Sequence, residues 1–372
     1  MKTIQIATLL CAASMLLPCS HAQPSDADTR QLTILRAQAE NGDAQAQFEL
    51  GVAFSLGKFG AATNYDEAVK WWRNAAEQHH AVAQYNLGVS YREGRGVTTN
   101  YLEAVKWFRK AAEQNDAEAQ RSLGACYATG LGVATNYVEA VKWYRNAAEQ
   151  NLAEAQNILG FHCANGLGVA KDYVEAVKWY RNAAEQNLAE AQYNLGNCYA
   201  IGQGVATNHV EAVRWWRKAA EQNLAEAQYN LGLCYASGQG VATNYVEAVK
   251  WYRNAAEQDH ADAQNNLGVC YVTGQGVAED AVAAVKWFRK AAEQNLASAQ
   301  SKLGLCYATG QGVAKDYVES YKWWRLAAAQ GDEDARRDMS TLERRMTQEQ
   351  IADGKKLAHE FKPRKVFPTG QR

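Results

Sequence analysis

Proline is nearly missing from this chain of 372 residues. Its four prolines stand only near the two ends, at Pro18, Pro24, Pro363 and Pro368. None lies between Ser25 and Lys362. Because proline lacks the backbone N–H and breaks helices, so long a stretch without it is typical of an all-helical body.

The chain also lacks an excess of charge of either sign. Its 39 Lys and Arg residues balance 40 Asp and Glu residues, for a formal net charge of -1. A nucleic-acid partner needs a basic stripe, and this balance leaves little material for one. Hydrophobic residues at 47% and aromatic residues at 10% argue against wholesale disorder. The composition therefore predicts a packed protein without a nucleic-acid partner.

Long apolar runs are limited to the first 22 residues. This segment contains one apolar run and ends with the small residues Ser20 and Ala22 at positions -3 and -1. The pattern predicts a secretory signal, residues 1–22, and an exported protein, periplasmic or secreted, with no membrane span. A lipoprotein signal ending at Cys19 is the competing interpretation, which Pro18 disfavours.

Motifs that carry catalysis are missing as well. The sequence contains no H-E-x-x-H, C-x-x-C, G-x-S-x-G or phosphate-loop pattern. We therefore predict a non-enzyme with no catalytic residue, cofactor or metal. The adjacent pair His162 and Cys163 is the one departure, and it has two interpretations: a nucleophile or metal pair, or a repacked core position. Neighbours on a helix point about 100° apart, which favours the core position.

Six cysteines follow the predicted signal: Cys126, Cys163, Cys198, Cys234, Cys270 and Cys306. An exported protein permits disulfides, and an even count is compatible with them. Five of the six, however, recur at one position of a predicted helix in different units. Neighbouring helices lie roughly 8–10 Å apart, whereas a disulfide needs alpha carbons within about 7 Å. We therefore predict buried, reduced cysteines.

What the sequence does contain is a fixed internal period of 36 residues. A glycine ladder keeps this step from the second member onward: Gly51, Gly88, Gly124, Gly160, Gly196, Gly232, Gly268 and Gly304. A tryptophan ladder keeps it throughout: Trp71, Trp107, Trp143, Trp179, Trp215, Trp251, Trp287 and Trp323. Since only the first glycine step is one longer, the extra residue belongs to the first loop, within 57–64.

Each unit carries two helical patterns, clearest in the sixth. Residues 224–235 place Ala227, Leu231 and Cys234 on one side, and residues 245–258 place Tyr245, Val249 and Tyr252 on one stripe. We expect Glu247 with Lys250, and Arg253 with Glu257, as charged neighbours on the exposed face of the second helix. Between the helices Gly238 to Val241 predicts a turn, and Asn244 predicts an N-cap.

Helices of about 14 residues are marginal alone in water, so neighbouring units must stabilise them. A glycine inside a helix costs roughly 1 kcal/mol relative to alanine, and Gly232 repeats that cost in every unit. We expect close helix packing to compensate. The period by itself predicts an alpha solenoid.

The recurring signature runs A-x-A-Q-x-x-L-G-x-x-Y, G-x-G-V and E-A-V-K-W-[WFY], as at Ala225–Gln228, Leu231–Tyr235, Gly238–Val241 and Glu247–Tyr252. It resembles the Sel1-like repeat family. Tetratricopeptide repeats share the Leu-Gly-x-x-Tyr piece, but their period is near 34 and they usually close with proline. The resemblance implies an all-α, right-handed superhelical solenoid of antiparallel helix pairs, whose first helices line a concave face.

Five segments follow from this organisation. They are the signal (1–22), an N-terminal linker and capping helix (23–42), eight repeats (43–330), a degenerate helix with a C-terminal capping helix (331–361), and a basic tail (362–372). In the degenerate helix Ser340 replaces the ladder glycine. Thr347 to Gln350 predicts a capping box that opens the last helix. The basic tail is either solvated or acts at an anionic surface.

The outward stripe of the first helices carries the best functional signal. Aromatic, amide and aliphatic side chains recur there: Tyr85, Asn86, Phe161, Tyr193, Asn194, Tyr229, Asn230, Leu233 and Asn266. Such a face is more adhesive than solubility requires, which favours a partner-binding groove for a protein or peptide. The competing interpretation is that adjacent first helices cover these side chains.

We accordingly expect an exported, non-enzymatic scaffold that binds a protein or peptide on the concave face, as the resemblance also implies. The alternatives are a cell-wall or carbohydrate-binding protein, in which exposed tryptophans stack on sugar rings, and an envelope signalling regulator. Some Sel1-like proteins are linked to penicillin binding or hydrolysis, but no nucleophile in this sequence supports hydrolysis.

Overall fold

The computed structural model describes residues 25–364, and within them the regular structure is helical. The chain divides into two compact units, Met1–Thr135 and Asn136–Arg372. The predicted signal lies outside the described residues. In the first unit the helices are α1 Asp26–Glu40, α2 Ala44–Leu56, α3 Tyr65–Glu77, α4 Ala81–Glu93, α5 Tyr101–Glu113 and α6 Ala117–Thr129.

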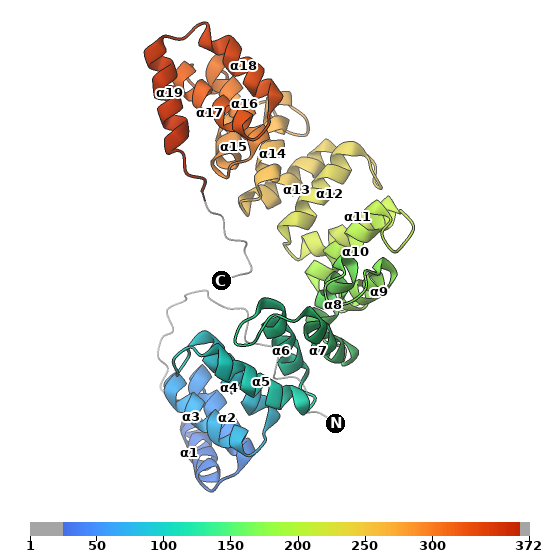
Figure 1. Ribbon diagram of the computed structural model, residues 1–372, viewed down its shortest axis with the longest axis vertical. Helices are drawn as coiled ribbons and strands as arrows, with labels where there is room; N and C mark the ends of the chain where they lie inside the picture. Colours follow the sequence, from blue (N-terminus) through green and yellow to red (C-terminus); the bar gives the residue numbers. More distant parts are fainter. Residues whose placement is uncertain (1–24, 365–372) are drawn as a thin grey trace. The chain divides into compact units, whose positions relative to one another are not determined.

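The second unit continues the same pattern and adds the end of the chain (Figure 1). Its helices are α7 Tyr137–Glu149, α8 Ala153–Asn165, α9 Tyr173–Glu185, α10 Ala189–Ile201, α11 His209–Glu221, α12 Ala225–Ser237, α13 Tyr245–Glu257, α14 Ala261–Thr273, α15 Ala281–Glu293, α16 Ala297–Thr309, α17 Tyr317–Ala329, α18 Glu333–Glu343 and α19 Gln348–Glu360.

The paired helices of 36-residue period form an alpha solenoid, as predicted. From α2 to α16 the even-numbered helices are the first helices of the repeats, and the odd-numbered helices from α3 to α17 are the second helices. Within each of the two compact units, a first helix packs most extensively on the second helix that follows it. The predicted helices of the sixth repeat are confirmed as α12 and α13, and the first loop, 57–64, is one residue longer than its counterpart, 94–100.

The turn chemistry of the sixth repeat also matches the prediction. Gly238 ends α12 in the left-handed conformation, with φ 76°, and its N–H donates to the Cys234 carbonyl. The side chain of Asn244 then accepts hydrogen bonds from the first N–H groups of α13. The end of α12 and the start of α13 are therefore delimited by local residues, whereas Leu224, the N-cap of α12, forms no side-chain cap bond.

The ladder glycines lie where an aromatic ring approaches the backbone of the first helix. A Cβ placed on Gly196 would lie 2.6 Å from Cδ1 of Trp216, and one on Gly232 would lie 2.6 Å from Cδ1 of Tyr252. The predicted close packing is thus confirmed. The ring comes from the second aromatic of each pair, and Trp72, Trp216 and Trp324 are buried as predicted.

A glutamine pair with one buried member connects successive repeats. Nε2 of Gln228 donates to the Ala220 carbonyl at the end of the preceding helix, at 3.2 Å. Oε1 of Gln228 accepts from Nε2 of Gln258, the C-cap of the next second helix, at 2.8 Å. The same two bonds recur at Gln84 and Gln114, at 2.9 and 2.7 Å. The pair satisfies the buried amide of the first glutamine and ties three consecutive helices together.

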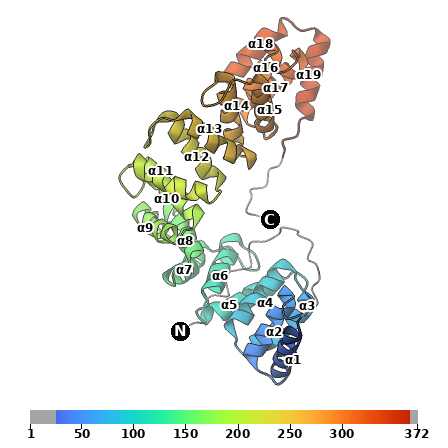
Figure 2. The ribbon, with the colours of Figure 1, turned by 180° about the vertical axis from the view of Figure 1, so that it is seen from behind.

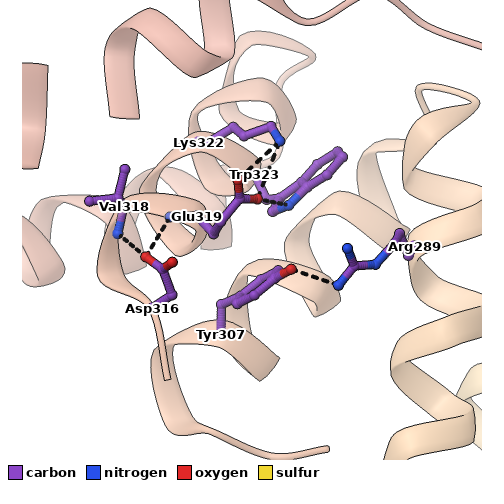
Figure 3. Close-up of polar contacts among 7 residues, drawn as sticks. All are labelled: Arg289, Tyr307, Asp316, Val318, Glu319, Lys322 and Trp323. Carbon is purple, nitrogen blue, oxygen red and sulfur yellow. Dashed lines mark hydrogen bonds and ion pairs between the residues drawn. The ribbon is translucent and has the colours of Figure 1, made fainter. Parts of the chain in front are cut away.

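Two predictions for the second helix of the sixth repeat are wrong. Tyr245, expected on the apolar stripe, is 40% exposed because it stands in the first turn, beyond the packed part of the helix. Arg253 does not pair with Glu257: its Nη2 donates to the Tyr271 hydroxyl of the next repeat at 2.9 Å. Figure 3 shows the equivalent bond from Arg289 to Tyr307. The expected pair of Glu247 and Lys250 is present, at 3.6 Å.

The C-terminal helices close the array. The degenerate helix is α18, and α19 begins with the predicted capping box between Thr347 and Gln350. Both ribbon views place α19 beside α17 (Figures 1 and 2). There Gly354 of α19 meets the ring of Tyr321, so the glycine-on-aromatic contact of the repeats is repeated by the capping helix.

The glycine contact predicts the stability of one variant. Gly196→Val forces a branched side chain into the space of the Trp216 ring, and we expect a loss of about 1–3 kcal/mol in the free energy of unfolding. Urea-induced unfolding followed by circular dichroism measures it. Glu190→Val, at an exposed position of the same helix, is the control and should lose about 0.5 kcal/mol through helix propensity alone. A melting temperature raised by Gly196→Val would contradict the contact.

The glutamine pair predicts a second variant. Gln228→Leu removes the side-chain donor to the Ala220 carbonyl, which keeps its bond from the Asn223 N–H, and it also removes the acceptor of Gln258. We expect the free energy of unfolding to fall by about 1–2 kcal/mol. Glu226→Leu, an exposed substitution on the same helix, is the matched control. Urea midpoints that coincide for the two variants would show that the pair contributes nothing to stability.

Candidate functional site

The nine residues predicted to bind a partner lie on five first helices, and we call them the first-helix stripe. Tyr85 and Asn86 belong to α4 of the first unit. The other seven belong to the second unit, on α8, α10, α12 and α14: Phe161, Tyr193, Asn194, Tyr229, Asn230, Leu233 and Asn266. All nine are exposed or half-buried.

Aliphatic and aromatic side chains give the stripe its exposed apolar area. Phe161 is 49% exposed, and Leu233, at the equivalent position two repeats later, is 38% exposed. Leu305, a further two repeats on, is 49% exposed. Large apolar side chains thus recur in solvent at one position of the repeat, which is the pattern of an interaction surface.

The tyrosines of the stripe are held by ring contacts. Tyr229 stacks on His260 with centroids 4.7 Å apart and lies 6.1 Å from the Tyr252 ring. Burial raises the pKa of Tyr229 and lowers the pKa of His260, so both rings are uncharged at neutral pH. In the first unit Tyr85 packs against Phe108 at 5.9 Å, and burial likewise raises the pKa of Tyr85. Tyr85 and Tyr229 are therefore contact surfaces held in place by neighbouring rings.

The amides behave differently, because several of them bond to one another. Nδ2 of Asn194 donates to Oδ1 of Asn157 on the preceding first helix at 2.9 Å. Asn197 accepts from Nε1 of Trp216 at 3.0 Å and lies 3.5 Å from Nδ2 of Asn230. For these amides the competing interpretation holds in part: neighbouring helices use them to join repeats. The side chains most available to a partner are therefore the aromatic and aliphatic members.

A second exposed row was missed by the sequence reasoning. The second residue of the six second helices from α5 to α15 is aliphatic and faces solvent: Val174, Val210 and Val246, for example, are 54%, 65% and 66% exposed. The signal was present as an aliphatic residue at a fixed place after the helix N-cap. It was missed because the other outward-facing residues of these helices are mostly charged.

The adjacent pair His162 and Cys163 is part of the core. Both residues are buried, and Nδ1 of His162 lies 2.9 Å from the Leu167 carbonyl. The imidazole packs 5.2 Å from the Tyr144 ring. Among residues 25–364, no group of three or more His, Cys, Asp or Glu side chains is placed to hold a metal ion.

The tryptophan ladder packs between repeats. Trp251 lies against the core cluster built by α11 and α12, and Trp287 lies against the cluster of α13 and α14. Lysine ammonium groups cover several of the rings, with Nζ of Lys218 4.3 Å from the Trp215 centroid. Rings enclosed in this way offer little free face for stacking on a sugar.

Two open hollows lie on the described surface, one on each compact unit. A hollow of about 440 Å³ on α9 is lined by Asp172, Val174, Glu175, Lys178, Trp179 and Asn182. It is open to solvent and draws on a single helix, so it has no convergent polar groups of the kind that orient a small ligand. In the part of the chain that the structure describes, no helix is both long and apolar enough to cross a membrane.

Comparison with known proteins agrees with the geometry. The model of the Sel1 repeat matches eight consecutive segments, residues 44–80, 81–116, 117–152, 153–188, 189–224, 225–260, 261–296 and 297–332. No curated protein matches the sequence significantly.

Two solved structures are similar over most of the chain. A Sel1 repeat protein from Oxalobacter formigenes is 30% identical, with a TM-score of 0.65, and the match covers 90% of this chain and 98% of that one. A protective antigen present in uropathogenic Escherichia coli strains, which displays an SLR fold, is 31% identical, with a TM-score of 0.50 and coverage of 90% and 87%.

The cysteines predict a chemical test. All six thiols are free and buried, as predicted, and burial raises the pKa of Cys198 and of Cys234 to about 11. At pH 8 the thiolates of these two residues are then about 100-fold rarer than in an unfolded chain, so we expect Cys198 and Cys234 to react with Ellman's reagent about 100-fold more slowly in the native protein.

Two further measurements check this explanation. Ser237→Cys, at the exposed end of α12, should react at the rate of an unfolded thiol. Because the unfolded state loses its thiol protons first, the free energy of unfolding should fall as pH rises from about 9 to about 11. Equal rates for native and unfolded protein would contradict the burial.

Proposed function

Because the chain belongs to the Sel1 repeat family, whose solenoids are typically protein-interaction scaffolds, we propose that it is an exported, non-enzymatic scaffold that binds a protein or peptide along the first-helix stripe. The observation that supports this most is the exposed apolar row of Phe161, Leu233 and Leu305 at one repeat position. Large apolar side chains in solvent at a fixed spacing favour a partner that contacts several repeats at once.

The neighbours of this row have the composition of a protein interface. Tyr193 and Tyr229 are half-buried and supply rigid area at low entropic cost, which is why tyrosine is enriched at interfaces. The bond from Asn194 to Asn157 joins adjacent first helices, so the stripe is continuous from α8 to α10. An extended partner would meet aromatic and aliphatic contacts in succession.

The exported location rests on the sequence of the first 22 residues, whose apolar run ends in the small residues Ser20 and Ala22. An exported scaffold with shallow surface hollows is suited to holding another protein rather than to converting a small substrate. Family members are generally non-catalytic, which agrees with the missing nucleophile motifs.

The triple variant Phe161→Ala, Leu233→Ala, Leu305→Ala removes the exposed apolar row and tests the stripe. We expect recovery of the partner from an envelope extract to fall at least tenfold, because a few central contacts dominate interface energies. Quantitative mass spectrometry of the captured proteins measures the change. Since all three side chains are exposed, circular dichroism should show that the variant remains folded.

The matched control removes the other exposed row with Val174→Ala, Val210→Ala and Val246→Ala. We expect this variant to recover the partner like the wild type. Unchanged recovery by the stripe variant would reject the stripe as the binding surface. Sedimentation of the wild type with purified peptidoglycan would instead favour a carbohydrate-binding function.

A further inference from the structure

The described residues that follow α19 contact the repeats. Phe361 ends the helix, and its ring meets the Trp323 ring edge to face, with centroids 5.6 Å apart. Three residues later, the N–H of Arg364 donates to the Glu293 carbonyl at 2.7 Å. The Arg364 guanidinium pairs with Oδ2 of Asp259 at 2.9 Å. We call residues 361–364 the tail segment.

The tail segment crosses three repeats. Trp323 belongs to α17, Glu293 is the last residue of α15, and Asp259 lies in the turn after α13. Three residues of extended chain span about 10 Å, which matches the roughly 8–10 Å between packed helices. From Phe361 to Arg364 the segment therefore passes from the last repeat to the one before it, and the long Arg364 side chain reaches a third repeat at Asp259.

Each of the three contacts has a separate physical basis. Trp323 is held in place by the bond from its Nε1 to Glu319 at 3.0 Å, shown in Figure 3, and its ring borders a core cluster on which Phe361 also packs. The Glu293 carbonyl is one of the helix-terminal acceptors that lack a partner within the helix. The negative end of the α15 dipole and the Asp259 carboxylate both favour a cation.

Asp259 departs from the commonest residue at its position of the repeat, as do His79 and Gly331 at theirs. The equivalent left-handed turn position is asparagine in five repeats: Asn115, Asn151, Asn187, Asn223 and Asn295. In the repeat of Asn223, Oδ1 accepts from the buried Gln228 at 3.1 Å, and Oδ1 of Asp259 accepts from Gln264 in the same way at 3.2 Å. Aspartate thus keeps the structural bond and replaces the amide NH2 with an oxygen. That oxygen is the one that binds Arg364.

We infer that Trp323, the Glu293 carbonyl and Asp259 form a binding site for an extended protein segment with an aromatic residue and, three positions later, an arginine. The tail segment is its intramolecular occupant, which an external segment of the same chemistry must displace. This site lies at the ends of second helices, so it goes beyond the proposed function of the first-helix stripe.

The test uses the full chain and a fluorescein-labelled peptide with the sequence of residues 360–365, followed by fluorescence anisotropy. In the wild type the tethered tail competes at an effective concentration of roughly 1 mM, which weakens peptide binding. Arg364→Gln removes the ion pair of the competitor with Asp259 and so weakens the competitor, and we expect the peptide to bind about tenfold more tightly. Lys362→Gln, which removes a charge from an exposed neighbour, should bind the peptide like the wild type.

Asp259→Asn tests the site itself, since it installs the residue that five other repeats carry and keeps the bond to Gln264. Added to Arg364→Gln, it should abolish the tenfold gain. A peptide with glutamine in place of arginine should bind the Arg364→Gln chain at least tenfold more weakly than the original peptide, which tests the site without any change to the fold.

The inference is overturned if Arg364→Gln leaves peptide affinity unchanged, or if the glutamine peptide binds as well as the arginine peptide. Neither result bears on the stripe, because the stripe residues are unaltered in these variants. Conversely, loss of partner capture by the stripe variant would leave the peptide titration unaffected, so the two proposals fail separately.

Discussion

The array depends on a glutamine pair, one member of which is buried, that every junction within the described units repeats in kind. Nε2 of Gln228 donates to the Ala220 carbonyl of the preceding second helix, and Oε1 of Gln228 accepts from Gln258 at the end of the following one. A helix of 13 residues is marginal in water, and a buried polar atom without a partner costs stability. The pair therefore satisfies the buried Gln228 amide and joins successive repeats by directional bonds. Apolar contacts between the helix pairs supply no such direction.

The regular step of 36 residues is also what creates a surface. Side chains such as Phe161 and Leu233 are distant in the sequence, yet the stacking of repeats returns them to equivalent exposed positions. The ladder glycines contribute by letting the aromatic ring of the second helix approach the first-helix backbone. The first helices consequently keep their inner side for packing and their outer side for contacts.

Positions at which one repeat differs from the others mark changes in side-chain contacts. Cys163 stands where most repeats have the tyrosine that binds an arginine, and Arg145 pairs instead with Glu175 at 2.8 Å. Cys163 itself is buried in the core. Asp259 is a departure on the surface, and it coincides with a contact from 105 residues away. Comparison with the other repeats therefore reveals a residue that keeps the hydrogen bond to the buried glutamine and adds a negative charge.

Local chemistry explains what could be predicted from the sequence alone. Several local features could be predicted because each depends on residues a few positions apart. They are the glycine turns, the asparagine caps and the capping box at Thr347. The solenoid follows from their period. The cysteine burial follows from a position shared by five repeats.

Only the tertiary structure decided which side chains meet across repeats. Arg253 reaches Tyr271 rather than Glu257, Asn194 bonds to Asn157, and Arg364 reaches Asp259. In each case the sequence offers several side chains that could form the same kind of bond. The distance and angle between packed helices determine which of them does. A sequence period states that repeats stack, whereas the offset of one repeat on the next determines the contacts, because hydrogen bonds and ion pairs weaken steeply with small changes in geometry.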